Sequence, residues 1–193
     1  MIVLFEGIDG VGKSTQISLS ANKFKDVIIT KEPGATALGE RLRDMLLGGE
    51  FRLDSTAEMF LFLADRAQHA KEILSAHKDK LILSDRGLIS GIAYAMNKLS
   101  LEKLIELNRL ALGDNLPDIV VLLLANKELL ATRLANRGCI DAIESRGLEY
   151  LMQIQKNMLL ATQALALPYI TIDASEPAES INKKIIKFIK EKL

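Results

Sequence analysis

The chain has 193 residues, a length that fits one large domain or two small ones, and we expect a single domain over residues 1–193. Its 25 basic and 25 acidic side chains cancel, so neither nucleic acid nor an anionic membrane is an expected partner. Apolar residues make up 49% of the chain and charged residues 26%, which excludes an intrinsically disordered protein. The single cysteine, Cys139, excludes an internal disulfide framework and a cysteine-rich zinc site. Because no secretory signal or membrane span is recognisable, we expect a cytoplasmic protein.

Five short apolar runs predict β-strands, at residues 2–6, 27–30, 81–84, 119–124 and 169–172. They are apolar throughout rather than alternating, as expected of strands that are covered on both faces. The segments between them are long enough for helical crossovers. The pattern therefore predicts an α/β fold with a five-stranded parallel sheet and helices on both faces.

Helical spacing of apolar residues predicts helices at 13–24, 37–47, 55–76, 101–111, 127–136, 148–165 and 178–192. The clearest of them follows Ser55 and Glu58, which have the spacing of a capping box. The lysine-rich segment 183–192 also spaces its apolar residues helically, which indicates an amphipathic helix rather than a nucleic-acid-binding arm.

Residues 7–14 read Gly-Ile-Asp-Gly-Val-Gly-Lys-Ser and satisfy the phosphate-binding loop (P-loop) motif G-x-x-x-x-G-K-[ST] between a predicted strand and a predicted helix. Glycines let successive backbone amides point at phosphates, and the helix start adds unpaired N–H groups. Lys13 would neutralise the β- and γ-phosphates, and the Ser14 hydroxyl would bind Mg²⁺. These features predict a P-loop NTPase three-layer sandwich that binds a nucleoside triphosphate. The expected contacts to it are Gly7, Ile8, Asp9, Gly10, Val11, Gly12, Lys13, Ser14 and Thr15.

The P-loop alone does not distinguish a signalling GTPase, a mechanical ATPase and a small-molecule kinase. A GTPase needs Asn-Lys-x-Asp after a late strand, whereas this chain has Asn-Lys-Glu-Leu at 126–129. Leu129 cannot accept a hydrogen bond from guanine, so we interpret the segment as an ordinary strand-to-helix turn. A mechanical ATPase usually carries further domains, for which the chain leaves little room.

A second group of polar residues suggests an acceptor site. Asp85 and Arg86 follow the apolar run at 81–84, at the carboxyl end of a predicted strand, where open α/β sheets bind ligands. Asp85 could hold Mg²⁺ or its water and Arg86 could bind a phosphate bidentately; a surface ion pair is the alternative. Phe62 and Arg66 share a helix face and could hold a base, although periodicity alone favours core packing for Phe62 and a salt bridge for Arg66.

Four segments together resemble the thymidylate kinase family of bacterial type. They read Phe-Glu-Gly-Ile-Asp-Gly-Val-Gly-Lys-Ser-Thr at 5–15, Thr-Lys-Glu-Pro-Gly-Ala-Thr at 30–36, Phe-Leu-Ala-Asp-Arg-Ala-Gln at 62–68 and Ser-Asp-Arg at 84–86. The likeness covers nearly the whole chain. It implies phosphoryl transfer from ATP with Mg²⁺ to dTMP, giving dTDP and ADP for dTTP synthesis, by a homodimer.

The resemblance also implies roles for side chains at the acceptor base and sugar. Phe62 would stack on thymine and Arg66 would contact the base edge. Ser90 would be a neighbour of the base, and Tyr94 would fill the space that a ribose 2′-hydroxyl needs.

Further implied roles concern the phosphates. Arg86 would bind the dTMP phosphate, and Asp9 would reach the deoxyribose 3′-hydroxyl or the waters linked to Mg²⁺. Two positions depart from the family pattern. Lys31 stands where bacterial members commonly have arginine, which replaces bidentate phosphate recognition by a point charge. Gly87 stands where an aromatic residue or histidine often follows Asp-Arg.

The segment 138–147 resembles the family's lid over ATP, but Ala142 replaces a usual lid arginine and Gly10 offers no arginine in the P-loop. A cation should still neutralise charge on the moving phosphoryl group. The candidates are Arg146, Arg137 and Arg133, each of which could instead be a surface charge.

The expected chemistry is in-line attack by a phosphate oxygen of the acceptor on the γ-phosphorus of ATP. That oxygen is already largely ionised at neutral pH, so His69 and His77 are expected to be bystanders. Two alternatives remain at this stage. One is a kinase for another monophosphate, such as dUMP, CMP or AMP, and the other is a nucleotide-operated switch.

Overall fold

The computed structural model describes residues 1–135 and 146–193 and confirms the predicted α/β class. Its five strands form one parallel sheet in the order β2-β3-β1-β4-β5. The strands are β1 (Ile2–Glu6), β2 (Val27–Lys31), β3 (Leu81–Asp85), β4 (Ile119–Leu124) and β5 (Tyr169–Asp173). Each of the five was predicted, and β2, β3 and β5 extend one residue further than expected.

The centre of the sheet is the core of the molecule. In β1 and β4, residues such as Val3, Phe5 and Val121 are fully buried because helices cover both faces. The edge strands β2 and β5 are partly exposed, and Ile29 of β2 has 57% of its surface accessible. An uninterrupted apolar run therefore indicates burial on both faces most reliably for the inner strands.

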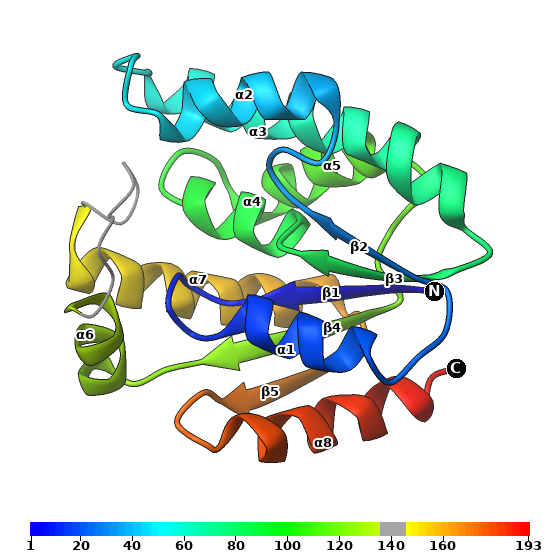
Figure 1. Cartoon of the computed structure of the whole chain (residues 1–193). Coiled ribbons are helices and arrows are strands. Elements are labelled where there is room, and N and C mark those ends of the chain that lie inside the picture. The colour runs from blue at the N-terminus through cyan, green and yellow to red at the C-terminus, as the bar shows by residue number, and fades with distance from the viewer. Residues whose placement is uncertain (136–145) are drawn as a thin grey trace.

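Helices pack on both faces of the sheet (Figure 1). They are α1 (Lys13–Ala21), α2 (Ala37–Leu47), α3 (Ser55–His69), α4 (Leu88–Ala95), α5 (Leu101–Leu112), α6 (Lys127–Ala135), α7 (Leu148–Leu165) and α8 (Ala178–Lys190). Figure 1 shows α1 and α8 in front of the sheet, with α4, α5 and α7 on the opposite face. Within the described ranges, none of these helices is both long and apolar enough to cross a bilayer.

Helix α3 departs from its prediction at both ends. The side chain of Asp54, rather than that of Ser55, caps it by accepting a hydrogen bond from Thr56 N at 2.8 Å. The regular helix ends at His69 and continues as a π-helical turn (Ala70–Leu74) and a 3₁₀ turn (Ser75–His77). Apolar spacing continues through these turns, which explains why the sequence predicted one helix to residue 76.

Helix α4 was not predicted at all. It starts after Gly87, which offers no side-chain cap, and most of its residues, including Leu88, Ile89 and Ile92, are buried. A helix that is buried on several sides has no polar face, so the amphipathic period by which helices are recognised is absent. The short helix carries Ser90 and Tyr94, two residues of the expected acceptor site.

The connections of the sheet create a crevice between β1 and β3. The chain leaves β1 toward β2 across one face and leaves β3 toward β4 across the other, so the loops after these two neighbouring strands diverge. The backbone N–H of Arg86 donates to the carbonyl of Phe5 at 2.9 Å and holds the two strand ends together. The P-loop and the Asp85-Arg86 pair therefore lie at the same switch point.

Candidate active site

The P-loop turns sharply from β1 into the amino end of α1. Gly7 has a φ of 144°, and a Cβ at this position would lie 2.6 Å from the carbonyl oxygen of Leu123 on β4. Gly12 precedes α1 with a φ of 98°, a left-handed conformation that glycine adopts at little cost. The loop therefore presents the unpaired amides and positive dipole end of α1 as an anion site.

Lys13 is folded back against this loop. Its ammonium group donates to the carbonyls of Gly7 at 3.0 Å and Ile8 at 3.1 Å, and it lies 3.8 Å from an oxygen of Asp9. Burial, helped by the neighbouring charge of Arg86, lowers the pKa of Lys13 to about 8. The lysine is thus a buried cation whose environment would favour an arriving anion.

The first turn of α1 meets the end of β3 through Ser14 and Asp85. The Ser14 hydroxyl donates to Asp85 Oδ2 at 3.1 Å. An alcohol and a carboxylate oxygen beside a phosphate site are the donors that Mg²⁺ takes together with substrate phosphates, so these residues fit the ion. Among the described residues, three or more His, Cys, Asp or Glu side chains do not gather into a metal cluster, and the ion would depend on phosphate oxygens for further ligands.

A cleft lies over the P-loop, and we call it the P-loop cleft. The predicted residues that line it are Asp9, Gly10, Gly12, Lys13, Ser14, Thr15, Lys31, Asp85, Arg86 and Arg133. Ile8 and Val11 instead bury their side chains in the core and leave only backbone for a ligand. Lys31, which was expected at the acceptor phosphate, lines this cleft and not the neighbouring pocket.

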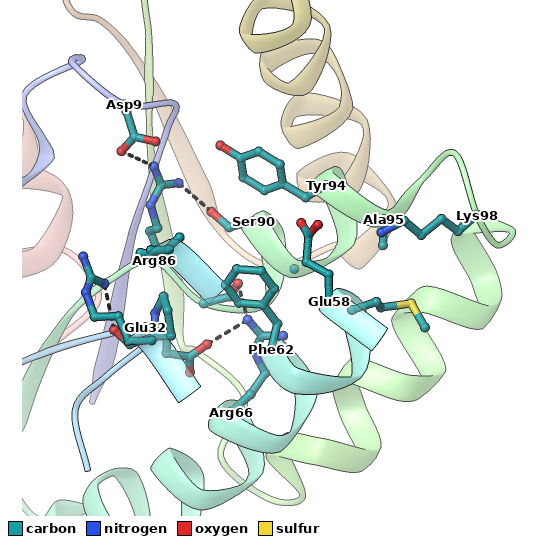
Figure 2. Close-up of a pocket in the computed structure, with 16 residues that line it drawn as sticks. Asp9, Glu32, Glu58, Phe62, Arg66, Arg86, Ser90, Tyr94, Ala95 and Lys98 are labelled. Atoms are coloured by element: carbon teal, nitrogen blue, oxygen red, sulfur yellow. Dashed lines mark hydrogen bonds and ion pairs between the residues drawn. The ribbon is translucent and has the colours of Figure 1, made fainter. Parts of the chain in front are cut away.

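A second cavity, the aromatic pocket, opens between α3 and α4 (Figure 2). Its lining includes five residues that were expected at the acceptor, namely Phe62, Arg66, Arg86, Ser90 and Tyr94. Phe62 is partly exposed at the wall of the pocket rather than buried in the core. The helix face shared by Phe62 and Arg66 therefore faces a cavity, as a base-binding site requires.

Arg66 is 2% exposed and is held by partners on several sides. Its guanidinium donates to Asn108 Oδ1 at 2.6 Å and to the carbonyl of Gly87 at 2.8 Å, and it forms an ion pair with Glu32 at 2.7 Å. The salt bridge that periodicity favoured is present, and Arg66 lines the pocket as well. A Cβ at Gly91 would lie 2.4 Å from Nη1 of Arg66, so α4 can approach the guanidinium only because this residue is glycine.

The far wall of the pocket combines Tyr94 with charged groups. The Tyr94 hydroxyl is buried and has no hydrogen-bond partner within the described ranges, and burial raises its pKa. Its ring lies 6.3 Å from that of Tyr150 on α7. Glu58 and Lys98 also line this side, and Figure 2 shows Glu58 directed into the space near Tyr94.

Arg86 ties the two cavities together. Its guanidinium donates to Asp9 Oδ1 at 2.5 Å, to Ser90 Oγ at 3.0 Å and to the carbonyl of Gly7 at 3.1 Å. Its own backbone adopts a φ of 72°, an uncommon conformation for a non-glycine residue that occurs at functional sites. The side chain is therefore fixed at the point where P-loop and pocket meet.

Ser90 is in turn held by Glu6, the last residue of β1. Glu6 accepts from the backbone N–H of Ser90 at 3.1 Å and from its hydroxyl. Burial raises the pKa of Glu6, and the hydrogen bonds from Ser90 and the charge of Arg86 oppose the shift. Sequence reasoning missed Glu6 because a single acidic residue at a strand end gives no sign of a partner 84 positions away.

Four residues line both the P-loop cleft and the aromatic pocket: Asp9, Glu32, Arg43 and Arg86. Sequence reasoning singled out neither Glu32 nor Arg43. Arg43 on α2 donates to the carbonyl of Pro33 at 2.9 Å and adds a second guanidinium at the junction. Its position in an amphipathic helix gave no signal, since a partly exposed arginine there is ordinary.

The three candidates for a lid cation have different surroundings. Arg133 on α6 donates to the P-loop carbonyl of Gly10 at 3.0 Å and to Ala174 O at 2.9 Å. Arg146 instead forms an ion pair with Glu58 at 2.8 Å and lies 5.4 Å from the ring centre of Tyr150. Arg137, Ala142 and most of the expected lid fall outside the described residues.

A P-loop with a hydroxyl and a carboxylate for a metal, joined through two guanidinium groups to an aromatic pocket, defines a P-loop nucleotide kinase. The family model for thymidylate kinase matches residues 5–185. The chain is 48% identical to the thymidylate kinases of Campylobacter curvus, over 98% of this chain and 100% of that protein, and of Aliarcobacter butzleri, over the full length of both.

A solved structure agrees with these relatives. The crystal structure of thymidylate kinase from Ehrlichia chaffeensis superposes with a TM-score of 0.77 at 25% identity, covering 98% of both chains. The chain therefore belongs to the thymidylate kinase family, whose members use ATP to phosphorylate dTMP to dTDP. The resemblance on the four sequence segments is confirmed.

Proposed function

We propose that the P-loop cleft binds the triphosphate of ATP while the aromatic pocket binds dTMP, with the phosphates of the two nucleotides meeting beside Arg86. The observation that carries this proposal is that Asp9, Glu32, Arg43 and Arg86 line both cavities. A nucleotide whose base occupies the aromatic pocket can then direct its phosphate at the end of a triphosphate on the P-loop.

On the donor side, backbone amides of residues 7–15 and the ammonium of Lys13 bind the triphosphate. Ser14 and Asp85 hold Mg²⁺, which when bound would neutralise negative charge on the phosphates. Arg133 is the candidate best supported as an additional donor-side cation, because it already contacts the P-loop.

On the acceptor side, Phe62 stacks on thymine and Arg66 contacts the base edge. Tyr94 occupies the space that a ribose 2′-hydroxyl would need, and Ser90 lies beside the base while it orients Arg86. The Arg86 and Arg43 guanidiniums bind the phosphate, and Asp9 sits at the sugar end of the nucleotide. These roles are supported by the position of each side chain at the pocket wall.

Transfer then needs no covalent intermediate on the protein. A phosphate oxygen of dTMP, ionised at neutral pH, attacks the γ-phosphorus in line, and ADP leaves. Arg86 keeps the attacking phosphate in position, and Lys13 stabilises charge on the triphosphate. Both histidines are bonded elsewhere, His69 to Thr30 and Glu32 and His77 to Ile73, so neither is assigned a proton transfer.

The proposal extends to how the protein exists in the cell: one domain over residues 1–193, a homodimer in the cytoplasm, with small nucleotides and no nucleic acid or membrane as partners. Zero net charge supports the last part. Leu38 on α2 and Phe60 on α3 are 47% and 55% exposed, and these packed helices offer apolar surface to a second copy. Sedimentation at micromolar concentration tests this, since a monomer would contradict it.

A coupled assay of ADP release tests the function most simply. The enzyme is given ATP and Mg²⁺ with dTMP, dUMP, CMP or AMP in turn, and Lys13→Ala serves as the inactive control. We expect the fastest release with dTMP. Faster release with another monophosphate would contradict the assigned acceptor, and no release with any of them would leave only a nucleotide-operated switch.

A further inference from the structure

A network of four buried polar side chains lies beside the aromatic pocket: Thr30, His69, Glu32 and Arg66. His69, at the end of α3, lies between Thr30 of β2 and Glu32 just after it. Its Nδ1 is 2.8 Å from Glu32 Oε1, and its Nε2 is 2.7 Å from Thr30 Oγ1. The other oxygen of Glu32 lies 2.7 Å from Nη2 of Arg66. All four residues are at most 6% exposed, so water does not compete for these contacts.

The protonation states of Glu32 and His69 in this network follow from their contacts. Burial alone would raise the pKa of Glu32, but Arg66 and the hydrogen bond from His69 together hold it below its usual value. An ionised carboxylate only accepts hydrogen bonds, so Nδ1 of His69 carries the proton and donates it. His69 therefore fixes one carboxylate oxygen of Glu32, and Arg66 lies against the other.

Two residues of this network line the pocket. Glu32 and Arg66 are among the lining residues that Figure 2 shows, whereas Thr30 and His69 do not line the pocket. Two nitrogens of the Arg66 guanidinium are used by Asn108, Gly87 and Glu32. Its Nε–H is buried and has no partner in the described part of the chain. Arg66 therefore brings a guanidinium with one unused donor to the wall of the pocket.

Arginine carries only donors, so it can satisfy a carbonyl oxygen on a base but not an amino group. A pyrimidine with a 4-oxo group, such as thymine, accepts from it, whereas a 4-amino pyrimidine leaves donors facing each other. The strength of this choice depends on how firmly the guanidinium is held, because a tilted arginine can move away from an unfavourable group. Glu32 therefore has to be fixed in turn, and His69 is the residue that does so.

We propose that His69 is a positioning residue for base selection: by fixing Glu32 it aligns Arg66 so that the enzyme prefers a 4-oxo over a 4-amino pyrimidine monophosphate. This inference rests on the proposed placement of the base against Phe62 and Arg66. It changes the role of His69 from bystander to part of the specificity machinery, without contact to the substrate.

The test compares kcat/KM for dTMP with kcat/KM for 5-methyl-dCMP. The second nucleotide differs only in that an amino group replaces the 4-oxo group and the neighbouring ring nitrogen N3 carries no proton. We expect His69→Ala to lower this ratio by about tenfold, as expected for the loss of one buried charged hydrogen bond. The KM for ATP should stay within about twofold, since none of these four polar residues belongs to the P-loop. His69→Asn keeps a donor near the position of Nδ1 and should restore most of the ratio. His77→Ala is the matched control, because the imidazole of that histidine bonds to the carbonyl of Ile73 in its own segment.

Two further variants keep the test decisive. Thr30→Val removes the group that holds the other ring nitrogen and should lower the ratio in the same direction even if His69→Ala fails to fold. Arg66→Lys reports on the underlying function: an unchanged ratio in this variant means that Arg66 does not select the base. A ratio that falls in Arg66→Lys but not in His69→Ala or Thr30→Val overturns the positioning role alone. An equal loss toward dTMP, 5-methyl-dCMP and ATP in the His69 variants would also overturn it, because only general destabilisation acts in that way.

Discussion

The hydroxyl of Ser14 donates to the carboxylate of Asp85 across 3.1 Å, joining the first turn of α1 to the end of β3. The two residues are 71 positions apart in the chain and adjoin the two loops that diverge at the switch point of the sheet. Their oxygens lie on the P-loop side of the site, where Mg²⁺ would bind between protein and triphosphate.

The first prediction concerns this pair. Asp85→Asn keeps the size of the side chain but removes its charge, so we expect the Mg²⁺ concentration for half-maximal activity to rise by about 10- to 100-fold. A magnesium titration at saturating ATP and dTMP measures it. Asp114→Asn, in an exposed turn after α5, is the control. An unchanged magnesium requirement in Asp85→Asn would remove this residue from the metal site.

The second prediction concerns pH. Burial holds the pKa of Lys13 at about 8 in the free protein, and a bound triphosphate would raise it again because it supplies negative charge. ATP binding should therefore take up protons near pH 8. Affinity should be highest below pH 8 and should fall by up to about tenfold per pH unit above it. Calorimetry in two buffers of different ionisation enthalpy measures the proton uptake, which should vanish in Lys13→Met.

The same depressed pKa has a consequence for stability. Between pH 8 and the ordinary lysine pKa of 10.5, the folded protein binds fewer protons at Lys13 than the unfolded chain, so this group makes the free energy of unfolding rise with pH. Below pH 8 the buried charge is a net cost. Lys13→Met should consequently raise the thermal midpoint of the ligand-free protein at pH 7 by about 2 °C or more while abolishing turnover. A lower midpoint would show that the hydrogen bonds to the loop outweigh the desolvation of the charge.

A further prediction separates the two substrates. Arg86→Lys keeps the positive charge but loses the planar fork that contacts Asp9, Ser90 and Gly7 together. We expect the KM for dTMP to rise by about tenfold or more and the KM for ATP to change much less. Steady-state kinetics with each substrate varied in turn decides this. A larger effect on ATP would place Arg86 on the donor side instead.

The lid cation can be identified by comparing two arginines. Arg133 contacts the P-loop, so Arg133→Ala should lower kcat by up to roughly 1,000-fold if it neutralises the transferred phosphoryl group. Arg146 pairs with Glu58 at the aromatic pocket, so Arg146→Ala should act mainly on the KM for dTMP. Single-turnover measurements distinguish slower transfer from weaker binding. If Arg146→Ala slowed transfer and Arg133→Ala raised the KM for dTMP, Arg146 would be the donor-side cation instead.

The fold could be predicted largely from the sequence because its signals are local. Apolar runs marked the five strands, and the bounds of α2 and α7 agree with prediction to the residue. The two failures have different causes. Helix α4 lacks a polar face, and the widened turn after His69 has apolar spacing that a regular helix shares.

The site was predictable in part for the same reason. The P-loop is a contiguous motif, and the strand end and the helix face pointed to Arg86 and Phe62. The family resemblance gave these residues their roles and added Tyr94, and all three line the aromatic pocket. Glu6 and Arg43 carry no pattern of their own, because their partners come from other elements. Tertiary contacts likewise give His69 two bonded ring nitrogens, which no spacing in the chain could indicate.

The central claim is that acceptor and donor phosphates meet beside Arg86. A crystal structure with dTMP and a non-hydrolysable ATP analogue tests it most directly. The account predicts thymine against Phe62, the dTMP phosphate within hydrogen-bonding distance of Arg86, and the triphosphate on the P-loop. A thymine ring outside the aromatic pocket, or a dTMP phosphate seated on the P-loop itself, would contradict it.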